Sequence, residues 1–149
     1  DSLIIPYSGL RKEPRFSDKA PVITMDGAAV FNFTLKRVPP LITNIMREAD
    51  LQSKDIDYFV LHQPNKYILQ NIKKKMKLDD HKVPHMTQSV YGNQNSASIP
   101  GTINGFLGES YSSNKLTSLI AGFGIGLSWG AGIITTENIY APKTFHSGE

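Results

Sequence analysis

The sequence predicts an α/β fold, and three observations carry that prediction. The apolar run Tyr58–Leu61 has the length and composition of a buried strand. Apolar residues then recur with the spacing of one helical face, at Ile68, Leu69, Ile72 and Met76. Two further strands are expected at Leu116–Ala121 and Leu127–Thr135. With 149 residues and no internal repeat, these elements fit one α/β layer unit with a single core.

The composition is that of a folded globular chain, with 40% hydrophobic and 19% charged residues. There is no cysteine, which excludes disulfides and a thiolate metal site. No apolar run is long enough to span a membrane and no secretory pattern is evident, so we expect a cytoplasmic protein. The net charge of +3 fits either a solvated surface with extra lysines or a docking surface for an acidic partner.

The first elements of the chain are expected to be short. Leu3–Ile5 fits a strand followed by a loop, and Val22–Met25 fits another strand. Asp26 is placed to cap a helix, because its carboxylate can accept hydrogen bonds from free backbone N–H groups. Pro39 and Pro40 lack the N–H that a helix interior needs, so we expect the helix to break or kink there and a second segment to begin.

A polar cluster, His62-Gln63-Pro64-Asn65, stands where the strand Tyr58–Leu61 ends and the next helix begins. In an open α/β sheet, this edge is where ligands usually bind. The helix that follows carries a row of lysines away from its apolar face, at Lys66, Lys73, Lys74 and Lys75. The row fits either a solvated face or a docking surface. We expect no nucleic-acid partner, because no recognition motif or aromatic platform accompanies the lysines.

Two later segments carry further signals. Tyr91-Gly92-Asn93 indicates a tight turn, after which Ser96–Ser98 is expected to open a helix. Glycines alternate between the last two expected strands, at Gly122, Gly124 and Gly126. A phosphate-binding glycine loop should open a helix, whereas a strand follows here. The glycines therefore predict a turn that joins two strands and leaves a backbone N–H aimed into a site.

Several other residues favour ordinary structural roles. His81 and His85 have the spacing of metal ligands on a helix, but Pro84 separates them and no acidic residue completes the set. We therefore predict no metal site. The aromatic residues Phe33 and Trp129 are expected in the core.

Three of these segments together resemble the ketoacyl-acyl carrier protein synthase III family of the thiolase superfamily. They are His62-Gln63-Pro64-Asn65, the stretch from Tyr91 to Pro100 and the stretch from Gly122 to Ala131, which share the family's order and spacing. The resemblance covers Met25 to Thr135 and corresponds to the C-terminal half of the family.

The resemblance implies a fold and a domain division. The fold would be the C-terminal half of a thiolase-like fold, a mixed five-stranded sheet flanked by helices. Residues 1–20 would form a variable connecting segment, and residues 21–149 would form the thiolase-like domain. The half of the family that carries its catalytic cysteine would be absent from this chain.

The resemblance also implies a decarboxylating Claisen condensation, which joins an acyl thioester to malonyl-acyl carrier protein in fatty acid or related biosynthesis. His62, through Nε2–H, and Asn93, through its side-chain amide, would stabilise the enolate. The backbone N–H of Ile125, where the family often has glycine, would help hold a tetrahedral oxyanion. The nucleophile would be a cysteine of the N-terminal half. This chain alone would then be inactive.

The implied substrates are CoA or acyl carrier protein thioesters, and no cofactor is expected. The implied partners are the acyl carrier protein, met by the lysine row, the cysteine-bearing half, and a second copy in a homodimer. An alternative hypothesis remains open. The chain would then be a noncatalytic thiolase-like module that binds acyl carrier protein or another subunit, and the lysine row motivates it.

Overall fold

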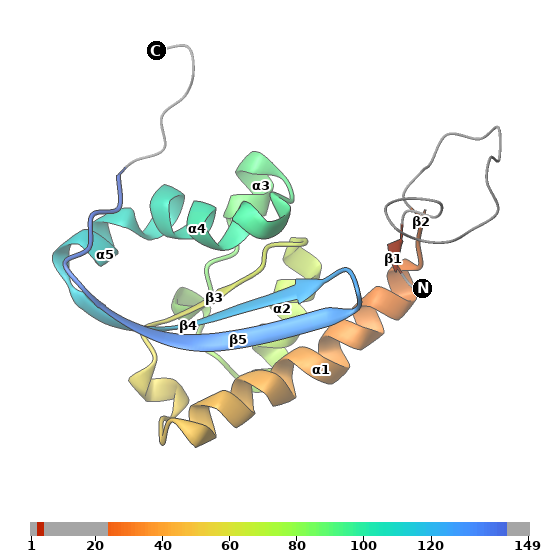
Figure 1. Cartoon of the computed structure of the whole chain (residues 1–149), viewed down its shortest axis with the longest axis horizontal. Coiled ribbons are helices and arrows are strands. Elements are labelled where there is room, and N and C mark those ends of the chain that lie inside the picture. Colours follow the sequence, from red (N-terminus) through yellow and green to blue (C-terminus); the bar gives the residue numbers. More distant parts are fainter. Residues whose placement is uncertain (1–2, 5–23, 143–149) are drawn as a thin grey trace, which may run out of the picture.

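The computed structural model describes residues 3–4 and 24–142 of the 149-residue chain (Figure 1). Its strands are β1 (Leu3–Ile4), β2 (Thr24–Met25), β3 (Tyr58–Leu61), β4 (Lys115–Gly124) and β5 (Ser128–Glu137). Its helices are α1 (Gly27–Glu48), α2 (Lys66–Met76), α3 (Thr87–Tyr91), α4 (Ser98–Thr102) and α5 (Gly108–Ser113). Short 3₁₀ turns lie at Ser53–Asp55, Asp80–Lys82 and Asn95–Ala97, and a π-helical turn, Ile103–Leu107, joins α4 to α5.

The central sheet has the strand order β3-β4-β5, in which β3 and β4 run parallel and β4 and β5 antiparallel. The predicted α/β class and the mixed sheet are therefore confirmed. The prediction of five strands in one sheet was wrong for the described residues. In the part of the chain that the structure describes, strands β1 and β2 pair with each other over two residues each and form a separate ladder.

Helices cover both faces of the central sheet, so the fold has three layers (Figure 1). Alternate side chains of a strand point to opposite faces. Phe59 and Leu61 of β3 accordingly pack into the main core with α1 and α2. Tyr58 and Val60 belong to a second cluster, which includes Leu107 and Tyr111 beside α5. The sheet thus separates a large core from a smaller one, and β3 contributes to both.

Helix α1 does not break at its two prolines, which corrects the expectation of a second segment. It is continuous from Gly27 to Glu48, with Pro39 and Pro40 inside it. Pro39 cannot donate to the carbonyl of Leu35 four residues earlier. Lys75 Nζ on α2 donates to that oxygen at 2.7 Å and so replaces the missing bond. The helix is also held by core packing of its buried side chains Val38, Ile42 and Met46.

Two further predictions about single residues have opposite outcomes. Asp26 caps α1 as predicted, because its Oδ1 accepts from the backbone N–H of Ala29 at 2.9 Å. Trp129 is not a core residue as expected, since 42% of it is exposed. It lies on β5, which has one neighbouring strand among the described residues, and packs at the margin of the sheet. Its ring forms a T-shaped pair with that of Phe33, with 5.4 Å between the ring centroids, and the Arg37 guanidinium lies 5.4 Å from the centroid of Trp129.

The division of the chain stays a prediction. Residues 1–20 lie outside the described residues, apart from Leu3 and Ile4. Among the helices that the structure describes, none is long and apolar enough to cross a bilayer.

Candidate active site

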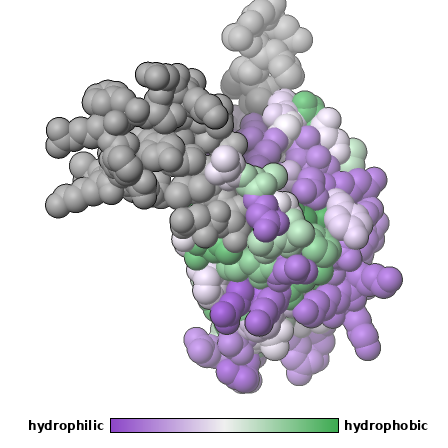
Figure 2. All heavy atoms as spheres, turned by 90° about the vertical axis from the view of Figure 1, so that its right-hand side faces the viewer, coloured by the Kyte–Doolittle hydropathy of each residue, from purple (hydrophilic) through white to green (hydrophobic). Residues whose placement is uncertain are grey.

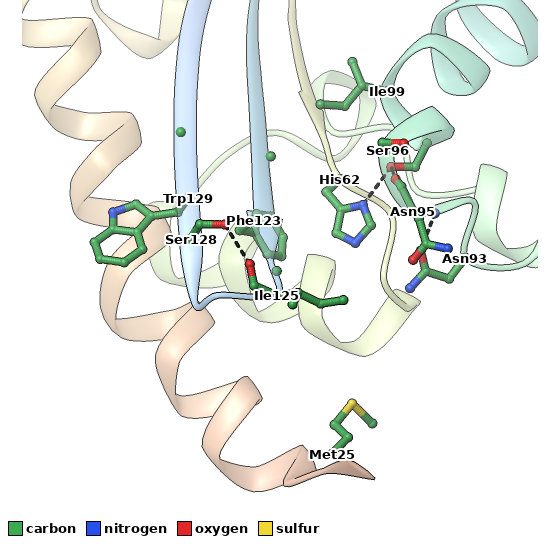
Figure 3. A pocket seen from close by; sticks show the side chains of 14 residues that line it. Met25, His62, Asn93, Asn95, Ser96, Ile99, Phe123, Ile125, Ser128 and Trp129 are labelled. Carbon is green, nitrogen blue, oxygen red and sulfur yellow. Dashed lines mark hydrogen bonds between the residues drawn. The ribbon is translucent and has the colours of Figure 1, made fainter. Parts of the chain in front are cut away.

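One cavity of about 740 Å³ brings together most of the residues that the sequence singled out. It is lined by the predicted residues His62, Asn93, Gly122, Gly124 and Ile125. These residues come from three separate places: the end of β3, the loop after α3, and the β4–β5 hairpin (Figure 3). Gly126, in the same hairpin turn, does not line the cavity. A smaller cavity of about 220 Å³ shares His62, Asn93 and Gly124 and reaches α1.

His62 is fixed by regular structure on its backbone side. Its N–H donates to the carbonyl of Ala121 at 2.8 Å, which extends the pairing of β3 with β4 by one residue. The ring is half-buried and meets the edge of Phe123 at 5.4 Å between centroids. Burial lowers the pKa of His62 below its ordinary value of 6.5, and the nearby carbonyl of Asn95 opposes this in part. The imidazole is therefore neutral at pH 7.

The carboxamide of Asn93 is held by a local bond. Its Oδ1 accepts from the backbone N–H of Asn95 at 2.9 Å. The turn before it uses Gly92 at φ +71°, a conformation that favours glycine. Since the oxygen is occupied by Asn95, the amide orientation is set, and the Nδ2 hydrogens have no acceptor in the described part of the chain. Asn93 is exposed and presents these hydrogens as free donors.

The glycine segment forms the predicted turn between two strands. Gly122 and Gly124 close β4, and residues 125–127 join it to β5. Gly126 adopts φ +138°, where a side chain would be strained. The carbonyl of Ile125 accepts from Ser128 Oγ at 2.8 Å, whereas its N–H finds no acceptor within the described residues. Ile125 is 62% exposed, and its side chain lines the cavity (Figure 3).

The cavity is lined in part by exposed apolar side chains. Met25, Ile125 and Trp129 line it and are among the large hydrophobic residues that the chain leaves exposed. Figure 2 views the face toward which the β4–β5 hairpin points, and shows apolar surface near its middle with hydrophilic residues to its right and below it. Such exposed apolar patches mark interaction or ligand-binding sites in soluble proteins.

Sequence reasoning missed the residue that contacts the imidazole most closely. Ser98 Oγ lies 2.7 Å from His62 Nδ1, 36 residues apart in the chain. The sequence indicated only that Ser98 stands in the opening of a helix, which it does as the first residue of α4. A small hydroxyl residue at a helix start is so common that no local signal distinguishes this one.

The four lysines predicted for docking do not act alike. Lys73 forms an ion pair with Asp80, which holds the pKa of that carboxyl below its usual range. Lys75 donates to the carbonyl of Leu35 in α1. The side chains of Lys66 and Lys74 are exposed and make no hydrogen bond or ion pair within the described residues. Lys66 begins α2, directly after Asn65, which lines the smaller cavity.

The residues that the structure describes contain no group of three or more His, Cys, Asp or Glu side chains that could hold a metal ion. Neither of the histidines His81 and His85 belongs to such a group. His85 Nδ1 instead lies 3.3 Å from the carbonyl of Val83, two residues away.

Comparisons with known proteins relate the chain to one family. The family model described as 3-Oxoacyl-[acyl-carrier-protein (ACP)] synthase III C terminal matches residues 46–136. A beta-ketoacyl-[acyl-carrier-protein] synthase III of Streptococcus agalactiae is 38% identical over 118 residues, which cover 75% of this chain and 35% of that protein. The crystal structure of a 3-oxoacyl-(acyl-carrier protein) synthase from Burkholderia xenovorans LB400 superposes with a TM-score of 0.83 at 30% identity, over 95% of this chain and 42% of that one.

The matched segment exceeds half of the chain, so this chain belongs to the 3-oxoacyl-[acyl-carrier-protein] synthase III family, within the thiolase-like fold. The family resemblance noted from the sequence is confirmed. The chain corresponds to the C-terminal part of that family and spans less than half the length of the relatives it matches.

Proposed function

We propose that this chain is the C-terminal part of a synthase III-type acyltransferase that catalyses a decarboxylating Claisen condensation. The reaction would join an acyl thioester to malonyl-acyl carrier protein, in fatty acid or related biosynthesis. One observation carries the proposal: His62, Asn93 and the free N–H of Ile125, far apart in sequence, belong to one cavity in a chain of this family. The substrates are CoA or acyl carrier protein thioesters, and the reaction needs no cofactor.

The two side chains suit the enolate of this reaction. When a malonyl thioester loses carbon dioxide, the electron pair of the broken C–C bond passes into an enolate, whose negative charge lies on the thioester oxygen. Neutral His62, through Nε2–H, and Asn93, through Nδ2–H, donate to that oxygen. Each donor in such a site is worth about 3–4 kcal/mol of transition-state stabilisation. Both side chains line the same cavity.

The remaining step requires a nucleophile that this chain does not have. The sequence contains no cysteine, and the chain spans less than half of its relatives. A cysteine of a second half would carry the acyl group as a thioester, with the Ile125 N–H donating to the oxyanion formed at its carbonyl. The enolate carbon then attacks that carbonyl and expels the thiolate. The exposed apolar lining of Met25, Ile125 and Trp129 fits burial against such a half, and the chain alone is inactive.

The direct test supplies the half that carries the cysteine, encoded as a separate chain or fused in frame, and measures condensation of an acyl thioester with malonyl-acyl carrier protein. We expect product only when both halves are present. His62→Ala should reduce the rate by about 10²–10³-fold, as loss of one oxyanion donor does in other enzymes. His81→Ala, which alters an exposed histidine away from the cavity, is the matched control. Equal rates for the two variants would contradict the proposal.

A second role, docking of acyl carrier protein, is favoured by one observation. The side chains of Lys66 and Lys74 are exposed, without hydrogen bonds or ion pairs in the described residues, and Lys66 directly follows Asn65, which lines the smaller cavity. If the chain were instead a noncatalytic thiolase-like module, binding of acyl carrier protein at this surface would be its function. Titration of acyl carrier protein at low and high salt tests it, because exposed charge pairs weaken as salt screens them. We expect Lys66→Ala to weaken binding more than Lys75→Ala does, because the Lys75 side chain is hydrogen-bonded to the Leu35 carbonyl of α1. If neither added salt nor Lys66→Ala changes the affinity for acyl carrier protein, this surface is not the docking site.

A further inference from the structure

The loop that carries Asn93 has one side toward the cavity and another toward helix α4. Asn93 and Asn95 line the cavity, whereas Gln94, the residue between them, lines neither cavity of the site (Figure 3). Gln94 is half-buried, and its side-chain oxygen Oε1 is shielded from solvent without a hydrogen-bond partner in the described part of the chain. Packing rather than hydrogen bonding therefore holds this oxygen in its place.

The Gln94 side chain packs against Gly101 of α4. A Cβ built on Gly101 would lie 2.6 Å from Oε1 of Gln94, 3.4 Å from its Cδ and 3.6 Å from its Nε2, and these are the three nearest atoms. Non-bonded heavy atoms prefer separations of about 3.5 Å or more, so only glycine leaves room here for the Gln94 carboxamide. The same holds if the amide is turned over, because Nε2 would then stand in place of Oε1.

A second contact ties the chain on the other side of Asn93 to the same helix. Thr87, the first residue of α3, precedes the loop, and its Oγ1 lies 2.7 Å from Oγ1 of Thr102, the last residue of α4. Both threonines are fully buried. Two neighbouring residues of α4, Gly101 and Thr102, thus contact the chain on both sides of Asn93.

These contacts relate the two candidate donors to each other. The bond from the Asn95 N–H to the Asn93 oxygen orients the amide within the loop, but it does not place the loop against the rest of the fold. Gln94 joins those two residues, so the position of its side chain on α4 determines where the Asn93 carboxamide stands. The same helix begins with Ser98, which contacts the His62 ring.

We propose that Gln94 and Gly101 are positioning residues for Asn93. The Gln94 side chain, packed on the backbone of Gly101, holds the loop so that the Asn93 amide stays in the cavity beside His62. Neither residue lines the two cavities, so each acts only through Asn93. The packing itself is a property of the folded chain, whereas its effect on catalysis rests on the proposed function.

The first test is structural and uses this chain labelled with ¹⁵N. Gly101→Ala should shift the NMR signal of the Asn93 side-chain amide, because the new Cβ displaces Gln94. In a Gln94→Ala background the same substitution should leave that signal where it was, since the three atoms nearest to the new Cβ are gone. Gly132→Ala is the matched control, because a Cβ there would meet its nearest atom at 3.9 Å.

Equal shifts in the two backgrounds would overturn the inference, and so would an unmoved Asn93 signal in Gly101→Ala. If Gly101→Ala does not fold, the double variant with Gln94→Ala should fold, because the obstructing side chain has been removed. Failure of both variants to fold would also contradict the inference.

The second test measures carbon dioxide release from a malonyl thioester by this chain together with its cysteine-bearing half. Gly101→Ala should lower kcat about tenfold with little change in KM, because a donor misplaced by about 1 Å is costly in the transition state. Gln94→Ala should itself lower kcat about two- to tenfold, since the loop loses its packing on α4. A wild-type kcat for Gln94→Ala would overturn the inference.

The background of the substitution separates positioning from a general structural role. Gly101→Ala should cause no further loss of kcat in Gln94→Ala, which lacks the clash, or in Asn93→Ala, which lacks the donor. A tenfold loss in all three backgrounds would contradict the inference. If Asn93→Ala alone releases carbon dioxide at the wild-type rate, the proposed function fails, and the NMR comparison still decides whether Gln94 and Gly101 position the loop.

Discussion

His62 and Asn93 reach the same cavity by different means. His62 follows a buried strand, and its backbone continues the β3–β4 pairing to Ala121. Its ring is held on one side by Ser98 and on another by Phe123. Asn93 stands on an exposed loop after a glycine turn, where one side-chain bond to Asn95 fixes its amide. The first donor is positioned by the core of the fold, and the second by local contacts.

This difference indicates which residues of the site depend on the packing of the core for their position. Changes in the core should move His62 and leave the Asn93 loop in place, whereas changes at the hairpin or the loop should leave the core intact. We expect four effects, which decrease in size from the core beneath His62 to the titration of its ring.

The largest effect is expected in the core beneath His62. Phe59 is fully buried in β3, three residues before the histidine. Phe59→Ala should lower the free energy of unfolding by about 3–5 kcal/mol, because it leaves a cavity in the close-packed core. Phe106→Ala, at a residue that is 39% exposed and whose ring contacts Tyr91 just before the Asn93 loop, should cost clearly less. Urea denaturation measures the free energy of unfolding of both variants. Equal losses would contradict the contrast between the core beneath His62 and the loop that carries Asn93.

A smaller effect is expected at the hairpin tip. Gly126 has φ +138°, and a Cβ there would lie 2.9 Å from the backbone nitrogen of Ser128. Gly126→Ala should therefore cost about 1–3 kcal/mol of backbone strain and displace Ile125. Gly124→Ala is the matched control, since a Cβ at Gly124 would meet nothing within 4 Å. Thermal unfolding of the two variants checks the prediction. A Gly126→Ala variant as stable as Gly124→Ala would show that the turn is not strained by a side chain.

The hydrogen bond between α2 and α1 should contribute less again to the free energy of unfolding. Lys75→Met removes the donor to the Leu35 carbonyl, which Pro39 leaves without its usual partner. We expect a loss of about 1 kcal/mol in the free energy of unfolding. Lys74→Met, on an exposed neighbour without such a bond, should be near neutral. If the two lysine variants unfold at the same urea concentration, the bond across the helices contributes nothing.

The smallest effect concerns pH and again separates His62 from the loop. Burial lowers the pKa of His62 in the folded chain below the 6.5 that the unfolded chain retains. Between these two values the unfolded chain binds the proton more readily, so the free energy of unfolding falls as pH drops below 6.5. The fall should stop once pH passes the folded pKa. His62→Gln should lose this component of the pH dependence, while Asn93→Ala should keep it. An NMR titration midpoint for His62 at or above 6.5 would contradict the sign.

Regular structure was predictable from the sequence where one pattern determined it. The apolar run of β3 and the helical face of α2 were found as expected, because burial of one face dictates both patterns. The break at Pro39 was predicted wrongly, since its missing bond is replaced by Lys75, which lies 36 residues later on another helix. Trp129 was misplaced because the sequence does not indicate that β5 is an edge strand.

The sequence was enough to predict which segments form the site, but not the contacts between their residues. The polar cluster after β3, the turn at Asn93 and the glycine hairpin could each be found, since each interrupts a regular pattern. Ser98 could not, because its role depends on a contact to His62 that only the folded chain creates. The pairing of β1 with β2 alone was equally hidden, since pairing partners are set by tertiary structure.

The most direct test of the central claim is decarboxylation of a malonyl thioester, measured separately from condensation, by this chain together with its cysteine-bearing half. If His62 and Asn93 both donate to the enolate oxygen, His62→Ala and Asn93→Ala should each slow carbon dioxide release by about 10²–10³-fold while the chain stays folded. Wild-type release of carbon dioxide by either folded variant would contradict the account.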